Sequence, residues 1–328
     1  MRDPAATPDA PIPSGAAELE ALAADRPQVT RERFTPNDFY GIATILKRYC
    51  GLAPDFVLPG IVPHGPYLHT NVWDKELSDP LPNLFPSAEI QRAVYAQKCA
   101  KPCHVIGFPY YYALRLLEDE LPDLRRRAAG SIVFPAHSTH HIISHFSQEE
   151  FIGQLRALPA EFQPVRVCLY WKDILLGRHK PYLEVGFACT TAGHMYDPQF
   201  LPRLVRMLHA HRFAVGNELG TSLLCAATSG LGVRILTHEV TYKGDATFTG
   251  LMGTGHELEI CRRFLAACHP AAAKFETQKN VADEALGRAF VREPEVLREL
   301  FESLAADLPV TNLRGWLARR KARARRKK

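Results

Sequence analysis

Short apolar runs alternate with amphipathic stretches through the second part of the chain. Each run has the length and composition of a buried strand, and helical periodicity separates one run from the next. The runs are 131–134, 165–171, 186–190, 213–215 and 233–236. Strands separated by helices are typical of a parallel sheet with helices on both faces. The pattern therefore predicts a Rossmann-like half over residues 129–245.

The first part of the chain repeats this alternation over a shorter length. Helical periodicity covers 36–50, 87–98 and 110–120, and apolar runs at 55–62 and 103–107 indicate strands. We predict a second, smaller Rossmann-like half over residues 31–128. Helical periodicity then dominates 246–312, and these helices are expected to pack back across both halves.

The N-terminal segment, residues 1–30, is acidic and rich in proline. It lacks the apolar core of a signal peptide, so we expect a disordered leader in which Ala16–Ala24 has the pattern of a short helix. No stretch of the chain approaches the ~18 apolar residues that span a bilayer. Several of the eight cysteines lie in apolar runs, which favours buried, reduced thiols and a cytoplasmic protein.

The positive charge of the chain is concentrated at its C-terminus. The segment Arg314–Lys328 contains nine Lys and Arg and no acid, so the rest of the chain carries −4 instead of the overall +5. This basic tail, residues 313–328, suits an anionic membrane surface, and peripheral association with the inner face of a membrane would follow. A solvated tail without a partner is the equal alternative. The acidic body has no nucleic-acid recognition module, which argues against a specific nucleic-acid partner.

The first candidate site follows the predicted strand at 213–215. Asn217, Glu218, Gly220, Thr221 and Ser222 stand between this strand and a predicted helix. The amides and dipole at a helix N-terminus favour anions, the hydroxyls add donors, and Glu218 is a candidate acceptor for ribose hydroxyls. Simple N-capping by Thr221 or Ser222 is the structural alternative. The segment matches neither dinucleotide nor P-loop fingerprints.

The second candidate site follows the strand at 131–134 and contains His137, Ser138, Thr139 and His140. Loops at the carboxyl ends of parallel strands converge on one edge of a sheet, so this loop is expected to face the first site across a switch point. Imidazole and hydroxyl groups suit phosphate oxygens. As an alternative, His141 and His145 have the spacing of a helical metal pair, which would indicate a metal-dependent hydrolase using the cluster from His137 to His145.

The third candidate site lies in the first half. His64 stands in a Pro/Gly loop after an apolar run, and its ordinary pKa suits a general base. A loop histidine bonded to the backbone explains the same residue equally well. Asp74 is an alternative base on the same polar segment. Lys172 and Arg178 follow a strand of the second half and are able to neutralise a diphosphate.

Taken together, these features resemble the GT-B class of glycosyltransferases, in which two Rossmann-like domains face a cleft and C-terminal helices close it. The resemblance covers the arrangement of residues 36–300 and is nearest to bacterial capsule and surface-polysaccharide enzymes. It implies that the second half holds a nucleotide-sugar through Asn217–Ser222 and the His137–Thr139 loop. It places His64 on the acceptor side. The chain departs from the class in its short first half and in the absence of a second Glu after Glu218.

The resemblance implies transfer of a sugar to a glycan or lipid-linked acceptor in polysaccharide biosynthesis. A first-half base would deprotonate the acceptor hydroxyl, while helix amides and the His/Ser/Thr loop would stabilise the departing phosphate. The nucleotide-sugar is the substrate, and neither a cofactor nor a metal is required.

Overall fold

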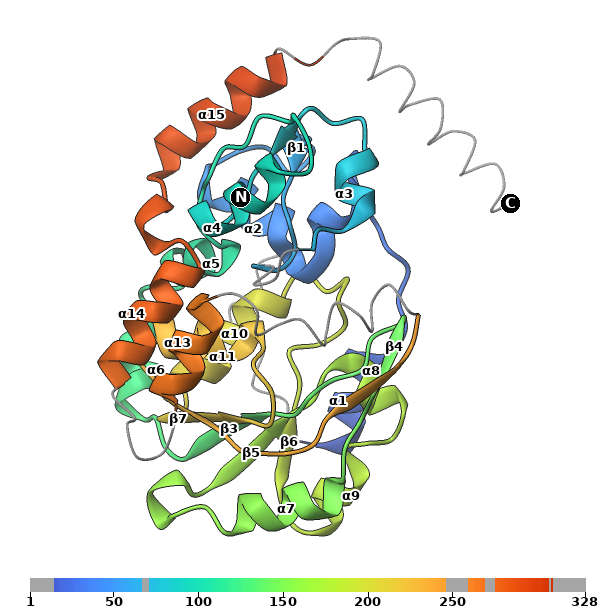
Figure 1. The fold of residues 1–328 in the computed structure, drawn as a ribbon, viewed down its shortest axis with the longest axis vertical. Coiled ribbons are helices and arrows are strands. Elements are labelled where there is room, and N and C mark those ends of the chain that lie inside the picture. Colours follow the sequence, from blue (N-terminus) through green and yellow to red (C-terminus); the bar gives the residue numbers. More distant parts are fainter. Residues whose placement is uncertain (1–14, 67–70, 246–258, 269–274, 307, 309–328) are drawn as a thin grey trace, which may run out of the picture.

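The computed structural model describes residues 15–66, 71–245, 259–268, 275–306 and 308. This part of the chain is a mixed α/β structure, with a parallel sheet and many helices (Figure 1). The predicted basic tail lies outside the described residues, as do residues 1–14 of the expected leader. No helix within the described ranges is long and apolar enough to cross a membrane.

Five parallel strands form the central sheet. They are β3 (Ser131–Phe134), β5 (Val165–Cys168), β6 (Ala188–Thr190), β7 (Phe213–Gly216) and β8 (Gly232–Ile235). Their spatial order is β6-β5-β3-β7-β8, which corresponds to 3-2-1-4-5 along the chain, the order of a doubly wound Rossmann sheet. Each of the five predicted strands is therefore present in one parallel sheet.

The strands are buried on both faces because successive side chains point to opposite sides. Ile132 and Ala214 belong to one core cluster, and Val133 and Val215 belong to another. The first face is covered by α10 (Phe200–His209) and α11 (Thr221–Thr228). The second face is covered by α7 (Gln148–Arg156), α8 (Trp171–Leu175) and α9 (Lys180–Glu184).

The first half of the chain is mainly helical. Its elements are η1 (Thr35–Gly41), α2 (Ile42–Tyr49), β1 (Gly60–Ile61), α3 (Asp74–Ser78), β2 (Asn83–Leu84), α4 (Glu89–Ala96), α5 (Pro109–Leu116) and α6 (Leu121–Arg126). The only sheet among its described residues is the parallel pair β1–β2, with one bridge from Leu84 to Cys103. The predicted second Rossmann-like half over 31–128 is therefore not confirmed among the described residues, where its sheet is reduced to this pair. Pro59 lies within the first apolar run, Pro63 follows that run and Pro102 precedes the second run, and each removes an amide donor that a longer strand needs.

The two halves share one hydrophobic core. Ile42 and Leu46 of α2 and Tyr112 of α5 belong to the same cluster as Leu204 of α10 and Leu224 of α11. Helices α2 and α5 contact each other, and α5 also contacts α10. The first half therefore packs directly on the first face of the sheet.

The C-terminal helices contact both halves, as the sequence predicts. They are α13 (Glu259–Ala267), α14 (Phe275–Ala285), η3 (Arg288–Phe290) and α15 (Pro294–Ala306), and they run along one side of the molecule (Figure 1). Helix α14 packs on α11, and Gln278 of α14 bonds both the amide and the carbonyl of Val233 on the edge strand β8. In α15, Phe301 contacts Phe85 of the first half at a centroid distance of 5.1 Å.

The N-terminal segment contains a helix that packs on the sheet half. Helix α1 (Ala16–Ala23) contacts α8 and β6, and its Leu19 and Ala23 are completely buried. The carbonyl of Leu22 accepts a hydrogen bond from the His194 amide at 3.0 Å. The described part of the expected disordered leader is thus a packed element, because Leu19 and Ala23 stand four residues apart and face the core together.

A two-stranded antiparallel ribbon joins β4 (Ile142–His145) to β9 (Thr241–Gly244). Strand β4 continues from the loop after β3, and His145 pairs with Thr241 at one end of the ribbon. The prediction that His141 and His145 share a helical face is therefore wrong. His145 lies in an extended strand, in which side chains four residues apart are not neighbours as they are on a helix.

Candidate functional site

The central strands β3 and β7 form the topological switch point of the sheet. The chain crosses from β3 to β5 on one side and from β7 to β8 on the other, so the loops that follow these two strands diverge. These are the two loops that the sequence singles out. They are linked by a hydrogen bond of 2.7 Å from the Ala136 amide to Oδ1 of Asn217. The predicted approach of the two loops is therefore present in the structure.

Helix α11 begins at the switch point without a side-chain cap. Gly220 is its N-cap residue, and Thr221 and Ser222 occupy the first helical positions, so neither hydroxyl caps the helix. A Cβ atom at Gly220 would meet no atom of the described residues within 4 Å, so no described side chain fills the space beside the helix start. An uncapped N-terminus with nearby hydroxyls is suited to an anion.

Asn217 adds a donor beside this helix start. Its residue is 5% exposed, and the buried Nδ2 group has no hydrogen-bond partner among the described residues. Its Oδ1 atom is already used by the Ala136 amide. A buried amide donor without an acceptor is costly, and a ligand oxygen would satisfy it.

Ser138 and Thr139 are used by the loop itself. The Ser138 hydroxyl accepts a hydrogen bond from the Ser144 amide at 3.1 Å, and the Thr139 hydroxyl accepts from the His141 amide at 3.1 Å. Ser138 is completely buried. These hydroxyls shape the turn between β3 and β4, in the manner of short polar residues in tight loops.

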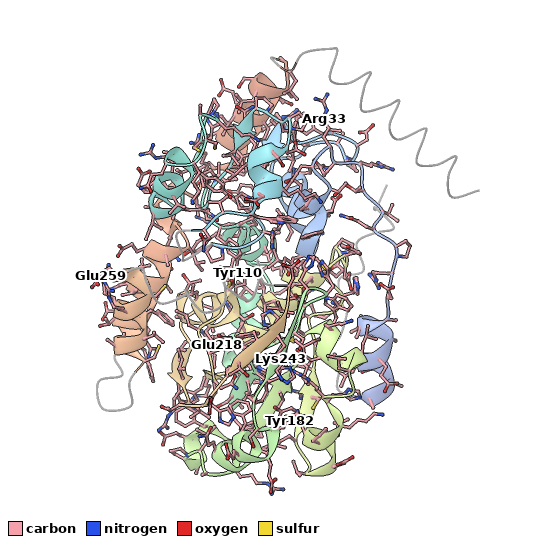
Figure 2. The ribbon with its side chains drawn as sticks, turned by 45° about the vertical axis from the view of Figure 1, so that its right-hand side comes forward. Arg33, Tyr110, Tyr182, Glu218, Lys243 and Glu259 are labelled. Atoms are coloured by element: carbon pink, nitrogen blue, oxygen red, sulfur yellow. The ribbon has the colours of Figure 1, made fainter. Side chains whose placement is uncertain are left out.

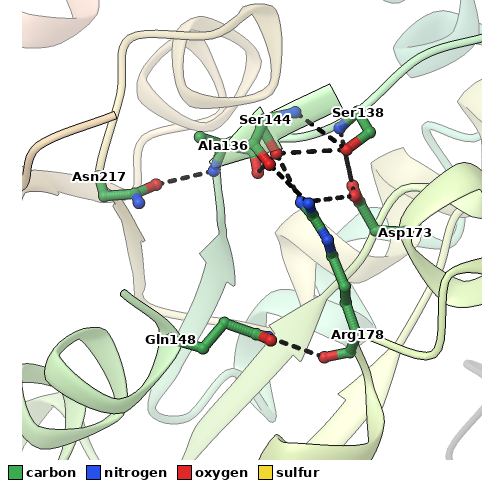
Figure 3. A network of polar contacts seen from close by, with 7 residues as sticks. All are labelled: Ala136, Ser138, Ser144, Gln148, Asp173, Arg178 and Asn217. Carbon is green, nitrogen blue, oxygen red and sulfur yellow. Dashed lines mark hydrogen bonds and ion pairs between the residues drawn. The ribbon is translucent and has the colours of Figure 1, made fainter. Parts of the chain in front are cut away.

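Asp173 and Arg178 hold this loop from below (Figure 3). The Ser138 amide donates to Asp173 at 3.0 Å. The Arg178 guanidinium donates to the Ser144 hydroxyl at 2.7 Å and to Asp173 at 3.1 Å. Burial raises the pKa of Asp173, while the nearby His137 and the bonds to Ser138 act against this shift. The network fixes the backbone that carries His137.

Glu218 is bonded to the β4–β9 ribbon. The Tyr242 hydroxyl of β9 donates to its carboxylate, and burial raises the pKa of Glu218. In Figure 2 Glu218 lies close to the strand that carries Lys243. The carboxylate that the sequence suggests for ribose binding therefore anchors the ribbon across the end of β7.

His64 from the first half faces the histidine loop of the second half. Its ring packs edge-on against Phe39 at 5.4 Å and Trp73 at 5.6 Å. Burial lowers the pKa of His64 to about 4, and the charge of the nearby His140 contributes in the same direction. The structure thus brings together two candidate histidines that stand 76 positions apart in the sequence.

The other histidines of the centre also favour the neutral form. Burial lowers the pKa of His137, although Asp173 opposes the shift. Burial lowers the pKa of His140 as well, with smaller contributions from His141, Lys172 and His194. Neutral imidazoles accept protons and hydrogen bonds, which general base chemistry requires.

Two tyrosines that the sequence analysis does not select as site residues join the halves between these histidines. The hydroxyls of Tyr40 and Tyr170 are 3.0 Å apart, and the Tyr170 ring packs on His137 at 4.7 Å. The ring centroids of Tyr40 and His64 are 6.3 Å apart. Burial raises the pKa of both phenols, so both stay protonated. One hydroxyl donates to the other, which leaves one hydrogen for a third group.

The backbone at Tyr40 is strained. Its φ angle of 59° makes it the only non-glycine residue with a positive φ in the described part of the chain. Gly41 follows with φ of 78°, and a Cβ atom there would lie 2.3 Å from the carbonyl oxygen of Pro198. Strain of this kind is concentrated at functional sites. Gly41, which follows the aromatic residues Phe39 and Tyr40, is the one feature of the sequence that indicates this turn.

The structure gives less support to Asp74 as a base and to a metal site in the cluster from His137 to His145. Asp74 is exposed at the start of α3, next to Trp73, whose ring contacts His64. His145 is exposed on β4. Within the described ranges no group of three or more His, Cys, Asp or Glu side chains is placed to hold a metal ion.

Comparison with known proteins gives little similarity. No family model matches the chain, and no curated protein matches it. Among solved structures, the α,α-trehalose 6-phosphate synthase of Burkholderia multivorans aligns with 94% of this chain and 74% of its own, at 11% identity and a TM-score of 0.32. A TM-score of this size does not establish a shared fold, so the function rests on the site described above.

Proposed function

We propose that the protein is a glycosyltransferase that moves a sugar from a nucleotide-sugar to a hydroxyl of a glycan or lipid-linked acceptor. The observation that supports this most is the topological switch point between β3 and β7, where the uncapped start of α11 is linked to the His137 loop through Asn217. Open α/β sheets bind nucleotides at such switch points, beyond the carboxyl ends of their parallel strands.

The phosphate of the donor would lie against α11. The amides and hydroxyls of Thr221 and Ser222 and the Nδ2 group of Asn217 supply donors, and the helix dipole favours negative charge. The same groups would stabilise the nucleotide as the bond between the sugar and the phosphate oxygen breaks.

The acceptor hydroxyl would be deprotonated by His64. Burial lowers the pKa of His64 to about 4, so its imidazole is neutral at ordinary pH, and its ring lies beside Tyr40 at the junction of the halves. The proton passes from the acceptor oxygen to the imidazole while that oxygen forms the new glycosidic bond. The nucleotide leaves with the electron pair of the broken bond. We further propose a role in surface-polysaccharide assembly, with Arg314–Lys328 holding the enzyme at an anionic membrane.

Thermal unfolding with UDP, GDP, CDP, CMP and ADP tests the donor site. A nucleotide at 100 times its dissociation constant is expected to stabilise the protein by about 2.7 kcal/mol. Asn217→Asp keeps the acceptor for the Ala136 amide but replaces the Nδ2 donor with negative charge, so the shift should be largely lost. Asn83→Asp, at a buried asparagine of β2, is the matched control and should retain the shift. Absence of a shift with every nucleotide would contradict the proposed function.

A further inference from the structure

A polar cavity of about 510 Å³ lies at the end of the β4–β9 ribbon, next to the centre described above, with which it shares Arg178. It is bounded by the start of α7, by the loop before β9 and by Arg178. Its volume is within the ~300–1,000 Å³ of small-molecule sites. The side chains that decide its chemistry are Phe146, Ser147, Glu150, Arg178, His238 and Glu239.

Aromatic rings support one wall of the cavity. Phe146, Phe151 and His238 contact one another with centroid distances of 5.7–5.8 Å. Phe151 is completely buried, so the group is fixed to the core of the second face. A hydrogen bond of 3.0 Å from Gln154 to the Thr237 carbonyl holds the loop of His238 against α7. The wall is therefore built by packing between distant segments.

Arg178 offers a planar set of hydrogen-bond donors, and its positive charge is balanced by a neighbouring carboxylate. Its Nη1 group bonds the Ser144 hydroxyl and Asp173, and its Nη2 group bonds the Ser144 carbonyl. A guanidinium has five N–H groups, so two have no acceptor among the described residues. The side chain is 19% exposed, and Asp173 balances its charge at 3.1 Å. The remaining donors are thus available to a neutral ligand.

Carboxylates supply the matching acceptors. Glu150 and Glu239 are exposed at the rim, and the Ser147 hydroxyl, which accepts from the Glu150 amide, keeps its own hydrogen to donate. Two carboxylates disfavour a phosphate or another anion. The described residues hold no group of three ligands suited to a metal ion. Planar donors, carboxylate acceptors and an aromatic wall are complementary to the alternating hydroxyls and C–H faces of a sugar.

We propose that this cavity binds a neutral saccharide. Arg178 also connects it to the reaction centre, because the Ser144 hydroxyl that it bonds lies 3.3 Å from the Ser138 hydroxyl, next to His137 in the chain. The saccharide is a segment of the acceptor glycan, a role that rests on the proposed transferase function. Saccharide binding itself does not depend on that function.

Saturation-transfer NMR on the full chain tests the cavity with neutral trisaccharides of glucose, galactose, mannose and N-acetylglucosamine, and with sulfate in competition. At least one trisaccharide is expected to bind, and sulfate should not displace it. The double variant Glu150→Ala/Glu239→Ala should weaken binding at least tenfold. Glu161→Ala/Glu299→Ala, which removes two exposed carboxylates elsewhere, should not.

The nucleotide thermal shift on the same samples separates the two proposals. The cavity variant should keep the wild-type nucleotide shift, which also shows that it folds. Trisaccharide binding without any nucleotide shift would support the cavity and overturn the transferase function. No trisaccharide binding, displacement by sulfate, or unchanged binding in the cavity variant would overturn the saccharide site even if nucleotides bind.

Discussion

Gly41 and Gly51 have similar backbone conformations in different surroundings. Both have positive φ angles, 78° and 64°. A Cβ atom at Gly41 would collide with the Pro198 carbonyl, whereas one at Gly51 would meet no atom of the described part of the chain within 4 Å. The first glycine is thus required by the contact between the halves, and the second only by its own dihedral angles.

Gly41→Ala is expected to lower the free energy of unfolding by about 2–4 kcal/mol, since it adds a collision to the strained φ angle. Gly51→Ala should cost about 1–2 kcal/mol from the dihedral strain alone. Urea unfolding of both variants measures the difference. Equal losses would show that the approach of Gly41 to Pro198 is not tight in solution.

Tyr40→Phe tests the bond between the two phenols. The variant keeps the ring and the backbone, so its stability should fall by only about 0.5–1.5 kcal/mol. Tyr110→Phe removes a comparable bond of 2.6 Å to Ser229 outside the centre. Release of nucleotide from a nucleotide-sugar should fall at least tenfold in Tyr40→Phe and stay near wild type in Tyr110→Phe. Equal rates in the two variants would assign the tyrosine pair a packing role only.

The sequence identified several residues of the centre and missed those whose role depends on distant contacts. His64, His137, His140 and Asn217 were selected because they follow strands, and parallel topology brings such loops together. The left-handed turn at Tyr40 lies in a segment whose periodicity predicted a helix. The bonds of Glu218 to Tyr242 depend on a partner 24 residues away, which no local pattern encodes.

At the scale of elements, the strands of the central sheet were predictable and those of the first half were not. Runs buried on both faces are apolar throughout, which makes β3 and β7 conspicuous. In the first half, the apolar run at 55–62 contains Pro59 and leaves only the two-residue strand β1. The run at 103–107 forms only a bridge at Cys103, and β2 comes from a segment that the pattern did not select. The ribbon strands β4 and β9 were missed because β4 directly follows a polar loop, β9 is largely polar, and their pairing is non-local.

The packing of helix α1 leads to a prediction at the scale of elements. Leu19 is completely buried between α1 and the second face of the sheet. Leu19→Ala should lower the free energy of unfolding by about 2–5 kcal/mol. The control Leu175→Ala removes the same atoms from a side chain that is 48% exposed and should cost much less. A neutral Leu19→Ala in thermal unfolding would mean that α1 is detached in solution.

Gln278 leads to a second prediction at the scale of elements, because its side chain bonds the backbone at the outer edge of β8. It bonds the Val233 amide at 2.8 Å, the Val233 carbonyl at 2.9 Å and the Ala267 carbonyl at 3.0 Å. Gln278→Ala leaves these buried groups without partners and should cost about 2–4 kcal/mol. The exposed Gln163→Ala should be nearly neutral. Chemical unfolding of both variants measures the contrast.

At the scale of the whole molecule, the buried histidines make stability depend on pH. A histidine whose pKa is lower in the folded state binds fewer protons there than in the unfolded state. For His64, with a pKa of about 4, the contribution is fully present above about pH 6.5 and is lost as the pH falls toward 4. Asp173 and Glu218, whose pKa burial raises, act in the opposite direction over their own acid range.

His64→Gln should therefore lose less stability than wild type between about pH 7.5 and 4.5. His145→Gln, at an exposed histidine of β4, should follow the wild-type curve. Urea unfolding across this range measures both. Parallel curves for wild type and His64→Gln would place the imidazole in a solvated position.

The packing of α1 on β6 and α8 has a consequence for synthesis of the chain. The helix is made before the elements that it packs on, and the surface that buries Leu19 is completed only when residues near 190 have been added. At about 5–20 residues per second, the ribosome needs roughly 10–30 s to make the intervening segment. During that interval the apolar side of the helix has no native surface to cover it, and chaperones that recognise short apolar segments have time to bind it.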